Sequence, residues 1–189
     1  MQTEHLTGIK KQFEYYESLV DKTIDQLSEE ELLWKYNEES NSIAVIVKHL
    51  YGNLLSRFTD FLTSDGEKTW RDRDEEFEDR VMSKQELLNK WNEAWQCVFD
   101  TIDSLTEDDL DKIIYIRNMG HTVMEALIRS VAHVASHAGQ IVFIGKMIKK
   151  DQWHSLSIPK GNSKMYNAEK FSKEKHREHF TDEFREKKE

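Results

Sequence analysis

The sequence predicts an all-α protein: a four-helix bundle with short connecting helices and a charged C-terminal tail helix. Two observations predict this fold class. The chain has only one proline and seven glycines in 189 residues, so few residues interrupt a helix. Apolar residues recur at spacings of three or four in four long segments, which gives each predicted helix one buried face. Four amphipathic helices of this length typically pack as a bundle.

The apolar positions and the start signals define these segments. The segments cover residues 6–27, 43–62, 87–105 and 127–148. A Ser or Thr followed three residues later by Glu is typical of a capping box, in which the two side chains satisfy free backbone amides at a helix start. This pattern occurs at 83–86 and 122–125, before the third and fourth segments. It recurs at 28–31, and a similar pattern ends in Asp at 106–109; both predict short helices after the first and third segments.

The connections differ in length and character. Residues 67–80 are mostly charged, so we expect an exposed loop there. Residues 112–120 alternate too little to predict a sheet, although a short extended pair is an alternative. The link 62–83 is longer than the path 27–42, which allows a topology other than a simple up-down bundle.

We predict two parts in the chain: a bundle over residues 1–167 and a charged tail over 168–189. From Glu169 onward the sequence is rich in both acids and bases, with Phe171, Phe180 and Phe184 among them. We interpret this stretch as a helix with a narrow apolar stripe that either docks on a neighbour or frays.

Composition argues against several function classes. The net charge of −9 makes nucleic acid a poor partner, because binding phosphates requires clustered Lys and Arg. We expect no membrane association, since no uninterrupted run of about 18 apolar residues is present. The N-terminus lacks the apolar core of a signal peptide. The single Cys97 cannot form an internal disulfide, and we interpret it as a packed thiol. Together these features predict a cytoplasmic protein.

Three histidines are the strongest functional signal. His133 and His137 are four residues apart within an apolar helical segment, which places both rings on one helix face beside the apolar stripe. His49 lies in the segment 43–62, also adjacent to the apolar positions. One His on one helix and a His pair on another could form a three-nitrogen metal site with an open position for water or substrate.

Alternatives remain at this point. A buried histidine can also be a hydrogen-bonded core residue, and the sequence does not show that the two helices face each other. Imidazole nitrogen suits Zn, Ni, Cu or Fe. Candidates for supporting the ligands or contacting a substrate are the nearby polar residues Asn53, Ser130 and Gln140.

The remaining histidines have weaker signals. His176 and His179 lie in the charged tail, and we expect both to be solvated. His121 and His154 flank the bundle ends. Each is either a surface residue or one that reaches the mouth of a site. His5 has no matched partner.

The chain resembles the DinB-like superfamily of bacterial four-helix-bundle metalloproteins over about residues 5–167. The resemblance rests on His49, on His133 and His137 followed by the run Ala138-Gly139-Gln140-Ile141, and on the flanking stretches 122–127 and 157–161. It implies a three-His site for Ni or Zn in a protein that is often a homodimer, with His49, His133 and His137 at the ligand positions. Relatives include bacillithiol S-transferases and mycothiol-dependent isomerases.

Two functional hypotheses follow. The first is a metal-dependent transferase that acts with a low-molecular-weight thiol such as bacillithiol on a small-molecule substrate. A hydrolytic version is less favoured, because no general base stands beside the His pair in the sequence. The alternative is a non-enzymatic, metal-holding or stress-related dimeric bundle.

Overall fold

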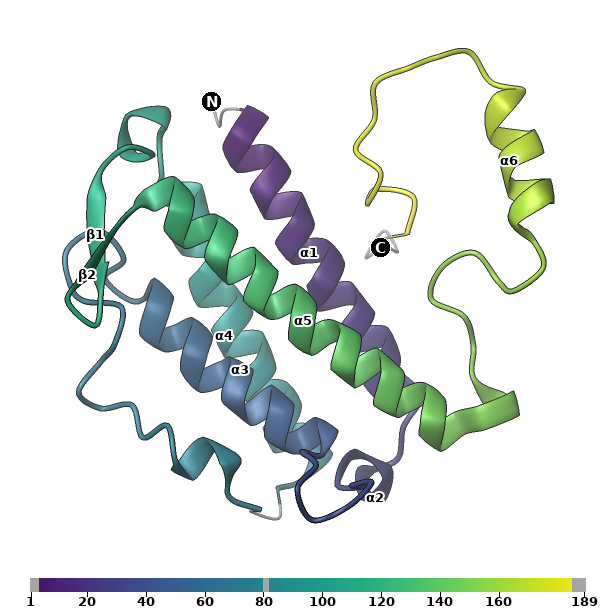
Figure 1. Cartoon of the computed structure of the whole chain (residues 1–189), viewed down its shortest axis with the longest axis horizontal. Helices are drawn as coiled ribbons and strands as arrows, with labels where there is room; N and C mark the ends of the chain where they lie inside the picture. The colour runs from purple at the N-terminus through teal and green to yellow at the C-terminus, as the bar shows by residue number, and fades with distance from the viewer. Residues whose placement is uncertain (1–3, 80–81, 185–189) are drawn as a thin grey trace.

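Four long helices form the bundle in the computed structural model, which describes residues 4–79 and 82–184 (Figure 1). They are α1 (Glu4–Asp25), α3 (Ile43–Phe58), α4 (Lys84–Ser104) and α5 (Val123–Lys149). Their apolar faces meet in one core, whose largest buried side chains include Phe13, Phe58, Trp91 and Trp95. The predicted four-helix bundle is confirmed. Residues 1–3, 80–81 and 185–189 lie outside the described residues, and so do the corresponding parts of the predicted bundle 1–167, loop 67–80 and tail 168–189.

Reciprocal side-chain caps begin the helices where the sequence patterns predict them. Each cap hydroxyl accepts a backbone N–H three residues ahead, while the carboxylate of that residue accepts the cap's own N–H. Such pairs begin the short helix α2 (Glu29–Leu32), α4 and α5, and they join Ser28 to Glu31, Ser83 to Glu86 and Thr122 to Glu125. At the 3-10 helix η2 (Glu107–Asp109), the backbone N–H and the hydroxyl of Thr106 both donate to Asp109 Oδ2, at 2.8 and 2.7 Å.

Helices α3 and α4 run parallel, so the bundle is not a simple up-down one (Figure 1). The Tyr51 hydroxyl donates to Glu93 at 3.1 Å, and further along both helices the Thr101 hydroxyl donates to the carbonyl of Phe58 at 3.0 Å. The connection between α3 and α4 must therefore return along the length of α3. It carries the 3-10 helix η1 (Glu75–Phe77) past the middle of α3.

A β-hairpin precedes α5. Strands β1 (Ile113–Ile116) and β2 (Met119–Thr122) pair antiparallel with Ile116 opposite Met119. The two turn residues, Arg117 and Asn118, have φ angles of 55° and 59°, the left-handed conformation that tight hairpin turns require. Asp65 accepts both of their backbone N–H groups at 2.8 Å. The stretch that alternated too little to predict a sheet is thus a short extended pair.

The tail differs from the helix expected over 169–189. The structure forms α6 earlier, at Ser163–Phe171, while residues 172–184 contain only turns and irregular chain that comes back to α1 (Figure 1). Phe180 and Phe184 do not line a helix stripe. Their rings pack on Tyr15, at centroid distances of 5.8 and 6.4 Å. Docking on α1 therefore replaces continuation of the helix.

One stretch of the described chain, Val123–Gln152, is long and apolar enough to cross a membrane by length and composition, with a mean hydropathy of 1.2 over an 18-residue window. Polar residues interrupt this stretch, so it contains no uninterrupted apolar run of that length. The core helix of a bundle meets the same criterion, and α5 packs against α1 and α3.

Candidate metal centre

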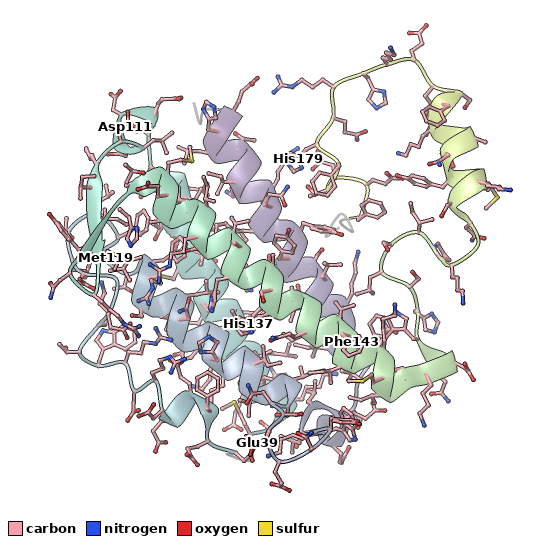
Figure 2. All side chains as sticks on the ribbon, in the orientation of Figure 1. Glu39, Asp111, Met119, His137, Phe143 and His179 are labelled. Carbon is pink, nitrogen blue, oxygen red and sulfur yellow. The ribbon has the colours of Figure 1, made fainter. Side chains whose placement is uncertain are left out.

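The structure brings His49, His133 and His137 together between α3 and α5; we call these residues the histidine cluster. The Nε2 atom of His133 lies 3.3 Å from that of His49 and 3.2 Å from that of His137. Each of the three residues offers a ligand atom within 4.8 Å of the others. Figure 2 shows His137 between α5 and α3. The sequence could not show that the two helices face each other, and the structure shows that they do.

The spacing of the nitrogens fits one tetrahedral ion. Zn–N bonds of about 2.0–2.1 Å at a tetrahedral angle separate two ligand nitrogens by roughly 3.3 Å. The two separations that involve His133, 3.3 and 3.2 Å, match this value, and the ligand atoms of His49 and His137 lie within 4.8 Å of each other. Three histidines in this arrangement could hold a metal ion.

Hydrogen bonds at the other ring nitrogens orient two of the three rings. His49 donates through Nδ1–H to Glu76 Oε2 at 2.9 Å, and His137 donates through Nδ1–H to Gln140 Oε1 at 2.9 Å. A ring that donates from Nδ1 can present the lone pair of its Nε2 to a metal ion. A carboxylate or carbonyl oxygen behind each imidazole is the usual support of a metal-binding histidine.

The protonation state of the cluster also suits a ligand role. Burial, reinforced by the nearby His137 and His49 rings, lowers the pKa of His133 to about 4. Burial lowers the pKa of His137 as well, although its hydrogen bond to Gln140 opposes the shift. Both rings are therefore neutral at pH 7, and neutral imidazole is the form that binds a metal.

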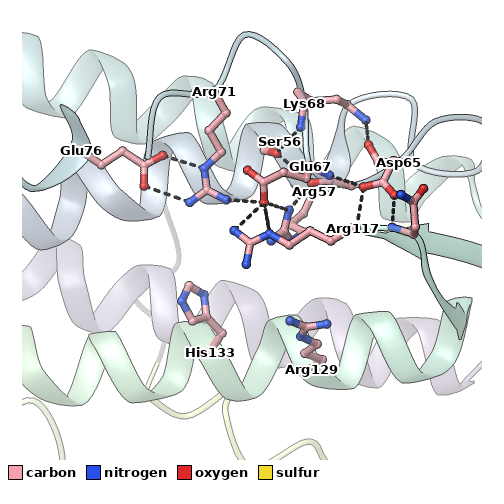
Figure 3. Close-up of polar contacts among 12 residues, drawn as sticks. Ser56, Arg57, Asp65, Glu67, Lys68, Arg71, Glu76, Arg117, Arg129 and His133 are labelled. Atoms are coloured by element: carbon pink, nitrogen blue, oxygen red, sulfur yellow. Dashed lines mark hydrogen bonds and ion pairs between the residues drawn. The ribbon is translucent and has the colours of Figure 1, made fainter. Parts of the chain in front are cut away.

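The loop predicted to be exposed over 67–80 contributes two buried side chains to the site, Arg71 and Glu76, so the prediction is wrong for these two, while residues 72–75 between them are exposed as predicted. The side chains of Glu76 and Arg71 are only 7% and 2% exposed. Arg71 donates to both carboxylate oxygens of Glu76, at 2.7 and 2.9 Å (Figure 3). Burial opposes ionisation of Glu76, but the hydrogen bonds from His49 and Arg71 outweigh it and hold the pKa of Glu76 below its ordinary value. Glu76 is thus an ionised partner for His49.

A glycine on α3 makes room for this carboxylate. A Cβ atom at Gly52 would lie 2.1 Å from Oε1 of Glu76, far inside van der Waals contact. Gly52 is one helical turn from His49, on the same face of α3. The pair Gly52 and Glu76 could not be found from local patterns, because the contact joins residues that are distant in the chain.

The three residues predicted to support the ligands or contact a substrate differ in their positions relative to the histidine cluster. Gln140 contacts His137, whereas Asn53 and Ser130 line a cavity of about 270 Å³ that opens beside the histidine cluster. His121 reaches the rim of this cavity through Arg129, whose Nη1 lies 3.2 Å from its Nε2.

The other histidines lie apart from the cluster. The backbone of His154 bonds to Gln26, and His5 pairs with Glu107. His176 is exposed, as expected, while His179 is half-buried on the tail segment near α1 (Figure 2).

Comparisons with known proteins give a family and a fold. A crystal structure described as that of the conserved protein of locus from Enterococcus faecalis superimposes with a TM-score of 0.57 at 16% sequence identity, covering 78% of this chain and 98% of that one. At this identity the similarity concerns the fold alone. A comparison with curated proteins finds no match. The family model described as "Protein of unknown function (DUF1572)" matches residues 1–162. The chain therefore belongs to the DUF1572 family.

Proposed function

We propose that this protein is a divalent-metal-binding member of the DinB-like superfamily and acts as a metal-dependent transferase with a low-molecular-weight thiol. The metal would be Ni or Zn, held by His49, His133 and His137. The observation that carries the proposal is the convergence of three histidine side chains, in which Nε2 of His133 lies at tetrahedral spacing from Nε2 of His49 and from Nε2 of His137. The thiol, with bacillithiol as the leading candidate, comes from the sequence resemblance.

The environment of the histidines favours a catalytic metal site over a structural one. Structural metal sites are closed by protein ligands, whereas catalytic ones keep a position for water or substrate. Three ligands leave such a position, and a cavity of about 270 Å³ lies next to it. This volume lies just below the range of about 300–1,000 Å³ that is typical of small-molecule sites, so a small ligand would suit it.

The roles of the residues follow from their contacts. When bound, the metal ion supplies a Lewis acid that lowers the pKa of a coordinated thiol. Glu76 fixes the ring of His49 and Gln140 fixes the ring of His137, while Asn53 and Ser130 face the substrate from the cavity wall. In the transfer, the sulfur forms a bond to an electrophilic carbon, the leaving group departs with its electron pair, and the thiol proton passes to solvent through the cavity.

A thiol-consumption assay tests the enzymatic proposal. We expect the wild-type protein, loaded with Ni or Zn, to consume thiol in the presence of one member of an electrophile panel, and His133→Ala to lose this activity. The variant His176→Ala changes an exposed histidine in the tail and serves as the control. Equal rates in wild type and His133→Ala would contradict a transferase and leave the non-enzymatic, metal-holding bundle as the better reading.

Gly52→Ala tests the support of His49 without changing a ligand. The added methyl group would collide with the carboxylate of Glu76 and displace it from His49. Loss of such a supporting hydrogen bond typically lowers metal affinity about 10- to 100-fold. We expect this loss in a competition titration with a chromogenic chelator. Gly8→Ala on α1, where a Cβ meets nothing within 4 Å, is the matched control and should bind like wild type. An unchanged affinity in Gly52→Ala would show that Glu76 does not support the site.

We further propose that the protein is a cytoplasmic homodimer that pairs through the outer face of α5. Ile128 and Phe143 are 57% and 62% exposed on this helix, with the small residues Ala132, Ser136 and Gly139 between them. Exposed apolar side chains grouped on one face favour an interface. Sedimentation velocity should give a dimer at micromolar concentration, and a monomer at every concentration would contradict the pairing.

A further inference from the structure

The cavity beside the histidine cluster is lined by arginine to an unusual degree for so acidic a chain. Its lining includes the five arginines Arg57, Arg71, Arg73, Arg117 and Arg129, and no acidic side chain among the residues that the structure describes. These residues come from α3, the loop after it, the hairpin turn and α5. The chain as a whole has a net charge of −9, so the sign of the charge reverses locally at this site.

Part of this positive charge is neutralised behind the cavity wall (Figure 3). Glu67 Oε2 lies 3.2 Å from Arg57 Nη2 and 2.9 Å from Arg117 Nη2, and Glu76 binds Arg71. Five guanidiniums against these two carboxylates leave three positive charges in excess. A third carboxylate, Asp65, accepts backbone N–H groups of the hairpin turn, and counting it still leaves an excess.

Arg129 and Arg73 carry the charge that faces the cavity. Among the described residues neither has a carboxylate partner. Arg129 donates to Nε2 of His121 at 3.2 Å, and the guanidinium of Arg73 lies over the ring of Phe77 at 5.2 Å. Phe77 in turn packs on His49, with ring centroids 4.9 Å apart.

These positions connect the arginines to the histidine cluster. Arg129 is one helical turn before His133 on the same face of α5, and Figure 3 shows both side chains directed toward the arginine and glutamate residues across the gap. A ligand that reached the cluster would therefore lie within the field of both guanidiniums. Charge at a concave, partly buried site attracts and orients an ion of opposite sign.

We propose that this cavity binds a small organic dianion, whose carboxylate or phosphate oxygens contact Arg129 and Arg73 while the rest of the molecule reaches the histidine cluster. The planar guanidinium fork matches the paired oxygens of both groups. The excess of positive charge calls for more than one negative charge on the ligand. This inference rests on the proposed function, because it identifies the bound anion as part of the substrate of the metal centre.

Calorimetric titration tests this inference on the full-length protein, metal-free and metal-loaded. The metal-free protein is prepared with EDTA, which is then removed by dialysis because EDTA is itself a polyanion. The probes are malonate and inorganic phosphate as dianion sources and acetate as a monoanion. We expect malonate or phosphate to bind the metal-free protein, acetate to bind much more weakly, and Arg129→Gln to weaken dianion binding about 10- to 100-fold. The stronger of the two dianions identifies the carboxylate or the phosphate source.

Arg177→Gln is the matched control, because it removes the same charge from an exposed arginine in the tail, 80% exposed and outside the cavity. It should bind the dianion like wild type. Three results would each overturn the inference. They are equal affinity in wild type and Arg129→Gln, no binding of either dianion, and binding that requires metal but is unchanged in Arg129→Gln. Normal metal uptake without anion binding would contradict this inference alone, and anion binding without metal uptake would contradict the proposed metal centre alone.

Discussion

His133→Ala is expected to abolish stabilisation of the fold by metal. A ligand that binds only the folded state stabilises it by about 2.7 kcal/mol when present at about 100 times its Kd. For a chain of this size, that corresponds to a rise in Tm of about 5–10 °C. His133 is the member of the cluster whose Nε2 lies within 3.3 Å of both other Nε2 atoms, so its loss leaves only two ligands.

Thermal unfolding of metal-free protein with and without added Ni or Zn measures this effect. Wild type and the tail variant His176→Ala should show the rise in Tm, and His133→Ala should not. Circular dichroism of the metal-free variant checks that its helices are intact. A full rise in Tm in His133→Ala would mean that the ion binds elsewhere.

Glu76→Ala is expected to destabilise the protein by about 3–5 kcal/mol, the typical cost of removing one partner from a buried ion pair. The reason is that the Arg71 guanidinium, 2% exposed, would remain buried without the carboxylate that accepts two of its N–H groups. The Nδ1–H of His49 would lose its acceptor as well. Urea unfolding of the metal-free protein measures the change in free energy of unfolding.

Two comparisons sharpen this measurement. Glu78→Ala removes the same side chain from an exposed position two residues away, and a change within about 0.5 kcal/mol is expected there. The double variant Arg71→Met with Glu76→Leu should recover much of the loss, because the buried guanidinium is then removed together with the carboxylate that binds it. A loss below about 1 kcal/mol in Glu76→Ala would contradict a buried ion pair at this position.

The parts of the structure that depend on local patterns could be predicted from the sequence. The helix starts at Ser83 and Thr122 depend on side chains three residues apart, and the shared face of His133 and His137 depends on helical periodicity. Three histidines on two helices gave a correct candidate cluster because a bundle brings inward faces together.

The residues that sequence reasoning missed are held by contacts between distant segments. Glu76 and Arg71 lie in a stretch whose composition is that of a solvated loop, and their burial depends on Gly52 and on the return of the chain along α3. The tail shows the same limitation. Phe180 and Phe184 pack on Tyr15 of α1, a partner that no local pattern in the tail identifies.

The most direct test of the metal centre is the metal content of protein purified without a His tag, combined with X-ray absorption at the metal edge. We predict about one Ni or Zn ion per chain, with imidazole nitrogens at about 2.0–2.1 Å. The ion should persist through dialysis in wild type and be lost in His133→Ala. A wild-type protein that contains no transition metal and takes up neither Ni nor Zn on reconstitution would contradict the account.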